Sequence, residues 1–230
     1  MSHRLAVLIS GSGTNLQAVL DAITEGTLAA EVSVVLSNIT TAAGLDRAVA
    51  AGVATITLDH RQYSSREDFD HAMIAELDRF QPETVVLAGF MRILTAHFVR
   101  HFHGRLINIH PSLLPRHKGL HTHRRALEAG DREHGCSVHF VTEELDGGPV
   151  IAQARVPVLA NDSEESLSNR VQAREHQLYP RVLEWRAQGR LQLGSEGVLL
   201  DGIRIPETGI DIDQHPDARP AAADGSQRLA

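Results

Sequence analysis

Short apolar runs alternate with longer amphipathic stretches through the first half of the chain. The runs are almost continuously apolar, which is typical of strands that are buried on both faces of a sheet. Helical patterns separate the runs, and glycine or proline marks several boundaries. The predicted strands are Leu5–Ser10, Val32–Ser37, Ala54–Leu58, Thr84–Ala88 and Arg105–Ile109, and the predicted helices run from the first glycine turn to about Glu25 and then over Ala42–Ala51, Ser65–Phe80 and Thr95–Phe102.

Buried strands that alternate with helices predict a Rossmann-like, doubly wound α/β fold, in which helices cover both faces of a mostly parallel central sheet. We expect one folded domain over residues 1–205. Beyond it the composition turns to Asp, Pro, Gln and Ala, which favours a disordered tail over residues 206–230. The later predicted elements are Thr122–Ala129, Ser137–Val141, Val150–Val158 and Ser163–Gln188, followed by short strands near Leu191 and Val198.

The composition is that of an ordinary globular protein, with 42% hydrophobic and 22% charged residues in a chain of 230. A net charge of −7, with histidine neutral, argues against a broad nucleic-acid surface, which would carry a basic patch. A small anionic ligand remains compatible, because backbone dipoles bind phosphate even on an acidic protein. Cys136 is the single cysteine, so no internal disulfide is expected and a cytoplasmic location is favoured. We see no apolar run long enough for a membrane span and no signal-peptide pattern.

A glycine-rich turn, Ser10-Gly11-Ser12-Gly13-Thr14-Asn15, follows the first predicted strand. Glycine lets the backbone approach a ligand closely, and the next helix directs free N–H groups to the same place, so a phosphate suits this turn. The residues equally suit a plain turn in which Thr14 or Asn15 caps the helix. A dinucleotide fingerprint needs glycine where Leu16 stands, and a P-loop needs a lysine that is missing. A monophosphate therefore fits better than NAD or ATP.

The fifth predicted strand ends in the sequence Asn108-Ile109-His110-Pro111. Residues two apart in a strand point to the same face, so Asn108 and His110 project together at the carboxyl end, where open α/β sheets bind ligands. An amide and an imidazole side by side can hold the oxyanion of an acyl-transfer intermediate. The alternative is a polar strand end that is simply solvated.

Two loops could complete such a centre. Ser112–Gly119 is basic and could border an anionic site, and Glu144–Pro149 is acidic with two flexible glycines. The second loop could carry Asp146 to His110, where a carboxylate would favour the imidazolium form. The spacing also suits a tight turn between strands, so the meeting of these side chains is left open by the sequence.

Several segments keep a common order and spacing from about Leu5 to Asp201: SGSGTNLQA, SREDFD, VVLAGFMRIL, LINIHPSLLP, GLHTHRRALEAGDREHGCSVHFVTEELDGGPVI and RVQAREH. In these segments the chain resembles the phosphoribosylglycinamide formyltransferases, which are folate-dependent enzymes of purine synthesis. The resemblance implies a single-domain formyltransferase fold and 10-formyltetrahydrofolate as co-substrate. It implies attack of the glycinamide amine on the formyl carbon, without a metal or a covalent enzyme intermediate.

The resemblance also assigns roles to residues. It makes Asn108 and His110 catalytic and Asp146 the aspartate that tunes the histidine. It divides the domain into a phosphate-binding half, at about 1–100, and a folate and catalytic half, at about 101–205. Met91, Ile93 and Leu94 would by themselves suit an ordinary core. The substrate phosphate and ribose are assigned to Gly13, Thr14, Asn15 and Glu175, and the folate to Arg66, Met91, Arg92, Ile93, Leu94, Asn108, Val141, Thr142, Glu143, Glu144 and Asp146.

Other functions fit the chain less well. A formyltetrahydrofolate hydrolase would use water in place of the amine, and we would expect an additional amino-terminal domain. A methionyl-tRNA formyltransferase would need a second, basic carboxyl-terminal domain. A non-catalytic phosphate-binding module would share the glycine turn but would have no use for Asn108, His110 and Asp146 together. We expect small-molecule substrates, no nucleic acid or membrane partner, and a monomer or weak homodimer.

Fourteen histidines raise a metal hypothesis. Closed zinc sites favour four ligands that include cysteine or spaced histidine pairs. His97 and His101 are four residues apart, but on a short helix with no glutamate between them. A metal centre is therefore disfavoured. Cys136 is disfavoured as a nucleophile, because it lies in an apolar strand and buried cysteine is usually inert. The other histidines considered are His103, His117, His121 and His123.

Overall fold

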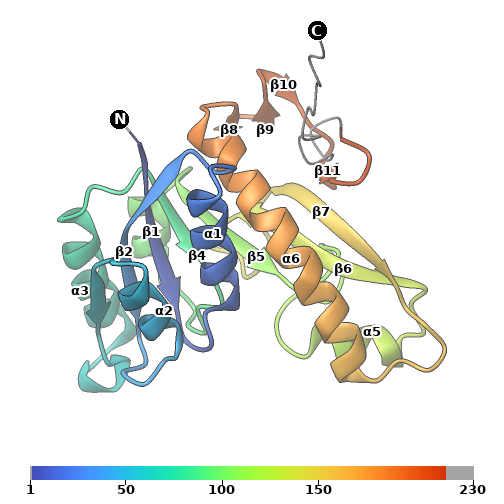
Figure 1. Ribbon diagram of the computed structural model, residues 1–230, viewed down its shortest axis with the longest axis horizontal. Helices are drawn as coiled ribbons and strands as arrows, with labels where there is room; N and C mark the ends of the chain where they lie inside the picture. The colour runs from blue at the N-terminus through green and yellow to red at the C-terminus, as the bar shows by residue number, and fades with distance from the viewer. Residues whose placement is uncertain (1, 216–230) are drawn as a thin grey trace, which may run out of the picture.

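The computed structural model describes residues 2–215, which form one large sheet with helices on both faces and a small second sheet (Figure 1). The strand order in the large sheet is β11-β7-β6-β5-β4-β1-β2-β3. β1 lies between β2 and β4, so the chain order reverses there, as in a doubly wound fold. The strands are β1 (His3–Ile9), β2 (Ala30–Ser37), β3 (Thr55–Thr57), β4 (Thr84–Leu87), β5 (Leu106–His110), β6 (Glu133–Phe140), β7 (Val150–Pro157) and β11 (Ile210–Asp211).

Strands β1 to β5 are parallel, so their carboxyl ends meet at one edge of the sheet. β6 is antiparallel to both β5 and β7, while β11 is parallel to β7. The predicted mostly parallel sheet is confirmed. The register places Leu87 of β4 on one side of Asn108 and His139 of β6 on the other. Strand pairing alone therefore brings His139 beside a predicted catalytic residue.

Two apolar cores lie on opposite faces of the sheet. Leu5, Val7 and Ile9 of β1 belong to one core, and Ala6 and Leu8 belong to the other, because successive side chains of a strand point to opposite faces. The first core includes residues of α1 and α6, and the second includes residues of α3 and α4. The predicted helices are confirmed, with ends within two residues of the prediction: α1 (Thr14–Thr24), α2 (Gly44–Ala50), α3 (Arg66–Asp78), α4 (Ala96–His101), α5 (Thr122–Glu128) and α6 (Glu164–Ala187), with a short 3₁₀ turn, η1 (His60–Gln62).

β6 begins at Glu133, earlier than the predicted Ser137. The reason is Gly135, which would discourage a strand prediction. In the structure it allows close pairing with β7, because a Cβ at this position would lie 2.0 Å from the carbonyl oxygen of Ala154. A glycine inside a strand therefore marks a close approach of two backbones here.

The chain beyond residue 205 corrects a prediction. β8 (Leu191–Gly194), β9 (Gly197–Leu200) and β10 (Ile203–Arg204) form the small sheet, and β11 then adds a strand to the edge of the large one. Ile212 is buried, and Asp211 pairs with Arg155 at 3.4 Å. The tail predicted from residue 206 is thus ordered through β11. The polar composition of this segment does not indicate a strand, and the two-residue strand β11 is stabilised by its pairing with β7. The rest of the predicted tail, residues 216–230, lies outside the described residues.

Among residues 2–215, no helix is long and apolar enough to cross a membrane. The longest, α6, crosses the face of the sheet from near α5 to the small sheet (Figure 1). Ser163 caps its start by accepting a hydrogen bond from the backbone of Ser166, and the acidic residues Glu164 and Glu165 follow in the first turn. Carboxylates there interact favourably with the positive end of the helix dipole.

Candidate active site

The carboxyl end of β5 holds Asn108 and His110 at the same edge of the sheet. The intervening Ile109 and the preceding Ile107 are buried in the core on the side of α6. His110 is 7% exposed and Asn108 is half-buried. A solvated strand end would leave both side chains exposed, so this alternative does not fit the structure.

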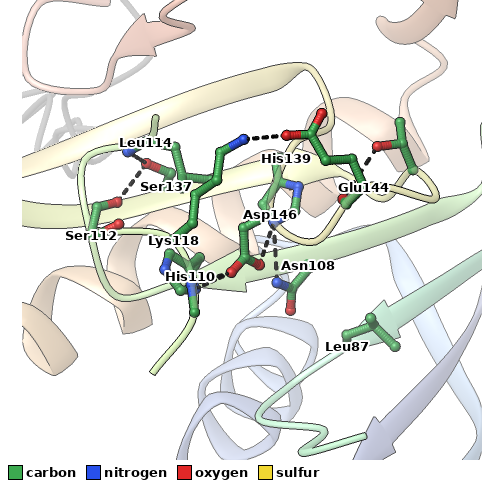
Figure 2. Close-up of polar contacts among 12 residues, drawn as sticks. Leu87, Asn108, His110, Ser112, Leu114, Lys118, Ser137, His139, Glu144 and Asp146 are labelled. Atoms are coloured by element: carbon green, nitrogen blue, oxygen red, sulfur yellow. Dashed lines mark hydrogen bonds and ion pairs between the residues drawn. The ribbon is translucent and has the colours of Figure 1, made fainter. Parts of the chain in front are cut away.

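Asp146 reaches this edge from the loop between β6 and β7 (Figure 2). Its Oδ2 lies 3.5 Å from Nδ1 of His110 and accepts a hydrogen bond of 2.8 Å from the backbone N–H of Gly119. The backbone of Asp146 has a φ of 48°, a left-handed conformation in which aspartate is enriched. The two side chains that sequence spacing left unconnected are therefore adjacent, and both are largely buried.

The loop that carries Asp146 is fixed by packing. A Cβ at Gly148 would lie 1.8 Å from the carbonyl oxygen of Phe140, so this glycine serves a close contact and does not act as a flexible joint. Lys118 forms an ion pair of 2.7 Å with Glu144, which joins this loop to the one after β5 (Figure 2). Both loops predicted to complete the centre therefore lie together over the end of β5.

His139 is a site residue that the sequence reasoning did not single out. Its Nδ1 must donate to the carbonyl oxygen of Phe140, 2.9 Å away, because a carbonyl only accepts. Nε2 is then the acceptor, and Nδ2 of Asn108 donates to it over 3.1 Å. Burial lowers the pKa of His139 to about 4. The ring is consequently neutral near neutral pH, and its 3.8 Å approach to Asp146 is a contact of a neutral ring with a carboxylate.

The signal that could have identified His139 was its alternation with Ser137 in β6, but this needs the β5–β6 register, which a single sequence does not supply. The contact with His139 fixes how the amide group of Asn108 is oriented. With one amide N–H directed at His139, the orientation of the amide group is set, and its second N–H is available to an acceptor in the site.

His110 has a second partner besides Asp146. Its Nε2 donates to the backbone carbonyl of His117 over 3.0 Å, so both ring nitrogens face oxygen acceptors. His117 has a φ of 52°, and its own ring pairs with Asp131 at 2.7 Å. The loop after β5 therefore folds back onto the histidine at its beginning.

The glycine turn ends β1 and begins α1, as predicted. Gly13 is the residue before the helix and has a φ of 69°, which glycine adopts without strain. Thr14 and Asn15 form the first turn of α1, but no side chain caps the helix there. The alternative of a side-chain cap from Thr14 or Asn15 is thus wrong, and the first N–H groups of α1 remain available to a ligand.

Glu175 of α6 lies at this helix start although it is distant in sequence. Nδ2 of Asn15 donates to its carboxylate over 2.9 Å, and Gln172 donates to the Thr14 hydroxyl over 3.3 Å. Burial raises the pKa of Glu175, and the Asn15 hydrogen bond opposes this shift. One turn further along α6, the hydroxyl of Tyr179 lies 2.9 Å from the carbonyl oxygen of Ile107, which anchors the helix to β5. The glycine turn and β5 are therefore joined through α6.

The segment after β4 contains the predicted folate residues Met91 to Leu94. Met91 is 70% exposed and Ile93 is 59% exposed, so neither is an ordinary core residue, whereas Leu94 packs against the core. The backbone N–H of Met91 donates to the Ser10 hydroxyl over 2.8 Å. This contact connects the segment to the glycine turn. Large exposed apolar side chains near the carboxyl ends of parallel strands are consistent with a binding surface.

The remaining predicted folate residues are less closely grouped. Val141 and Thr142 are half-buried beyond the end of β6, while Glu143 pairs with Arg100 of α4 at 2.8 Å. Arg92 is half-buried, and Arg66 is exposed at the start of α3. The segment at 91–94 thus follows the carboxyl end of β4, and the loop over 141–146 starts beside the amino end of β5, where Val141 donates to the carbonyl of Leu106, and returns to the carboxyl end at Asp146. The structure shows no comparable contact for Arg66 among the described residues.

The histidine-rich region forms ring contacts. His123 and His134 lie 3.1 Å apart between ring nitrogens, and burial lowers the pKa of His134 to about 4. Within residues 2–215, no group of three or more histidine, cysteine, aspartate or glutamate side chains is arranged to hold a metal ion. Cys136 is buried, and burial raises the pKa of its thiol, which makes the thiolate scarce at neutral pH.

Comparison with known proteins gives a consistent result. The model of the formyl transferase family matches residues 3–183. A phosphoribosylglycinamide formyltransferase of Escherichia coli is 55% identical over 210 residues, which cover 91% of this chain and 99% of that protein. The human trifunctional purine biosynthetic protein adenosine-3 is 46% identical over 84% of this chain, which covers 19% of that protein. A solved phosphoribosylglycinamide formyltransferase of Coxiella burnetii superposes with a TM-score of 0.88 at 48% identity, over 92% of this chain and 99% of that chain.

Proposed function

The chain belongs to the formyl transferase family, and we propose that Asn108, His110 and Asp146 form the centre at which it transfers a formyl group from 10-formyltetrahydrofolate to the amine of phosphoribosylglycinamide. The products are formylglycinamide ribonucleotide and tetrahydrofolate. The transferase activity in purine biosynthesis follows from relatives of high identity over nearly their whole length. The observation that carries the residue roles is the cluster of Asn108, His139, Asp146 and His110 at the end of β5.

The reaction begins with attack of the neutral amine on the formyl carbon. A C–N bond forms, and the electron pair of the C=O bond moves to oxygen. We assign the second N–H of Asn108 to this oxyanion, because the first is held by His139. A preorganised donor of this kind stabilises developing charge without further rearrangement. The attacking nitrogen then carries a positive charge and gives up a proton, while the folate nitrogen gains one. The electron pair on oxygen re-forms the C=O bond as the bond to the folate nitrogen breaks.

His110 is the second proposed donor. Its Nε2 donates a hydrogen bond to the carbonyl of His117, which supports a role as a donor to an oxygen in this site. We infer that the oxyanion replaces this carbonyl as the acceptor when substrate binds. The carboxylate of Asp146, 3.5 Å from Nδ1, stabilises positive charge that develops on the ring. A proton can then pass from the centre to the leaving nitrogen, directly or through water.

The ligands approach from the two sides of this cluster. We propose that Gly13, Thr14 and Asn15 bind the substrate phosphate through backbone N–H groups, with Glu175 near the ribose. Glu175 is held at this turn by the 2.9 Å hydrogen bond that it accepts from Asn15, which supports this assignment. The folate is assigned to Met91 to Leu94 and Val141 to Asp146, with Arg66 at its outer end. The exposed Met91 and Ile93 support this assignment.

We propose further that the phosphate site lies in the half formed by residues 1–100 and the catalytic centre in the half formed by residues 101–205. A monomer or weak homodimer in the cytoplasm, acting without a metal, remains the expectation from the sequence. Turnover that is unchanged by a chelator would support the last point. Loss of activity on chelation, restored by one metal ion, would contradict it.

A folate assay with two arms tests the function. The chain, 10-formyltetrahydrofolate and phosphoribosylglycinamide are expected to yield tetrahydrofolate and formylated amine in equal amounts, followed by absorbance and mass spectrometry. The second arm omits the amine. Comparable release of tetrahydrofolate in that arm would indicate a hydrolase, and no turnover in either arm would leave a phosphate-binding module as the better description.

A further inference from the structure

Helix α2 forms hydrogen bonds with the backbone of the glycine turn. The N–H of Gly44, the first residue of α2, donates to the carbonyl of Gly11 over 3.0 Å. One turn along the same helix, Nε of Arg47 donates to the carbonyl of Ser12 over 2.8 Å. Two consecutive carbonyls of the turn are thus engaged on the α2 side.

The contact of the two backbones is direct. A Cβ at Gly13 would lie 2.6 Å from the Cα of Gly44, and a Cβ at Gly44 would lie 3.0 Å from the Cα of Gly13. No side chain can therefore be placed between the turn and α2. Substitution of either glycine would displace the helix as well as the turn, so neither residue gives a clean test of ligand binding.

These carbonyl contacts determine where the N–H groups point. A trans peptide is planar, so its C=O and N–H bonds are directed to opposite sides. The carbonyls of Gly11 and Ser12 face α2, and the N–H groups of Ser12 and Gly13 consequently face away from it. Among the described contacts of residues 2–215, no acceptor is bonded to either of these N–H groups. They add to the free N–H groups at the start of α1 as donors for one anion.

Arg47 is itself fixed at a second point. Its Nη1 donates to Oε1 of Gln17 over 3.1 Å, and Nε2 of Gln17 donates to Asp21 over 2.8 Å. The guanidinium therefore joins the Ser12 carbonyl of the turn to Gln17 in α1, and Gln17 is held in turn by Asp21. An arginine provides such a fixed fork of donors, whereas a lysine presents one compact ammonium group.

We propose that Arg47 is a positioning residue for the substrate phosphate: by holding the Ser12 carbonyl and Gln17, it orients the Ser12–Gly13 peptide so that its N–H faces the bound phosphate. This inference rests on the proposed function, because it presumes that the turn binds that phosphate. Arg47 acts through the backbone and need not touch the ligand. The positive charge of Arg47 would add a longer-range attraction that the lysine variant retains.

The test compares R47A and R47K with the unaltered chain and with R79A, which removes an exposed arginine directly after α3 and its pair with Glu76. Michaelis constants are measured for both substrates, and inhibition by inorganic phosphate is measured against the amine. R47A is expected to raise the KM for phosphoribosylglycinamide and the inhibition constant of phosphate about tenfold, which is the size of one hydrogen bond to a charged donor. The kcat and the KM for folate are expected to stay within about twofold, as expected for lost ground-state binding.

The amide signal of Gly13 provides a direct readout by NMR. It is expected to shift on addition of inorganic phosphate in the unaltered chain and in R79A, and to shift much less in R47A and R47K. Three results would overturn this inference alone. The first is an unchanged KM for phosphoribosylglycinamide in R47A, and the second is R47K kinetics equal to those of the unaltered chain. The third is a similar worsening of kcat and of both KM values together with a lower melting temperature. Failure of the unaltered chain to formylate the amine would overturn the proposed function, and this inference with it.

Discussion

The two ends of the proposed reaction site are built in different ways. At the glycine turn, the donors proposed for the phosphate are backbone N–H groups, and Arg47 holds the Ser12 carbonyl on the side of α2 while Gln17 holds Arg47. At the end of β5, the groups of the proposed catalytic cluster are side chains, and the backbone holds them: the carbonyl of Phe140 fixes His139, and the N–H of Gly119 fixes Asp146. One site therefore presents backbone supported by side chains, and the other presents side chains supported by backbone.

The difference suits the two tasks. A phosphate needs several convergent donors and no proton transfer, which successive peptide groups provide. Formyl transfer needs a donor whose position relative to one carbon is fixed and a group that can carry positive charge, which require an amide and an imidazole. Substitutions at the catalytic end are therefore expected to lower kcat, and substitutions at the phosphate end are expected to raise one KM.

Asn108→Ala gives the largest expected effect. Removal of one oxyanion donor typically lowers kcat by about 10²–10³, or about 3–4 kcal/mol. The KM for the phosphorylated amine is expected to change little, because the glycine turn is untouched. Steady-state kinetics with circular dichroism as a folding control measure both. A loss of tenfold or less would show that Asn108 only positions substrate, and a larger change in KM than in kcat would remove the contrast between the two ends.

Asp146→Asn keeps the shape of the side chain and deletes its charge. A hydrogen bond to a charged group contributes about 1.5–3 kcal/mol, so kcat is expected to fall about 10- to 100-fold. Glu133→Gln, which removes a carboxylate from the exposed pair with Arg155 at the start of β6, is the matched control and is expected to change kcat less than threefold. Equal effects of the two variants would mean that carboxylate charge in general, and not the contact with His110, supports catalysis.

Truncation after residue 207 removes β11 and the buried Ile212, together with the ion pairs of Asp211 and Asp213. Burial of an isoleucine side chain is typically worth about 1.5–3 kcal/mol, so the melting temperature is expected to fall by several degrees. A chain that ends after residue 215 keeps these contacts and serves as the control. No contact of the glycine turn is removed, so phosphate inhibition measured at low temperature should be unchanged. An unaltered melting temperature would indicate that the edge strand contributes nothing.

The smallest expected effect is on the stability of the fold at acidic pH. The pKa of His139 is lowered by burial to about 4 in the folded chain, against an ordinary value near 6.5. The unfolded chain therefore binds protons first as the pH falls, and stability is lost between pH ~6.5 and ~4. His139→Gln is expected to reduce that loss by about 1–2 kcal/mol between pH ~6.5 and ~5, at 1.36 kcal/mol for each unit. His71→Gln, on an exposed residue, is the control for unfolding by urea at each pH. Parallel stability curves for the two variants would show that His139 is not held neutral.

The sequence by itself predicted the parallel strands, the helices and the glycine turn, because each depends on a local pattern: a buried apolar run, a helical period or a residue that permits a positive φ. It also predicted that Asn108 and His110 share a face, since strand geometry fixes that relation within three residues. The acidic loop suggested that Asp146 could reach His110, and the family resemblance added Glu175; the structure places Asp146 3.5 Å from His110 and Glu175 2.9 Å from Asn15.

Other features were decided only by the tertiary structure. The hydrogen bond between Asn108 and His139 depends on the register of β5 and β6. The hydrogen bond from Arg47 to the Ser12 carbonyl depends on the packing of α2 against the turn. The exposure of Met91 and Ile93 and the order of β11 likewise depend on which elements lie beside them. The sequence around an apolar residue is the same whether or not another element of the fold covers that residue. Contacts between segments far apart in the chain are set by strand order and helix packing, which no local window of sequence contains.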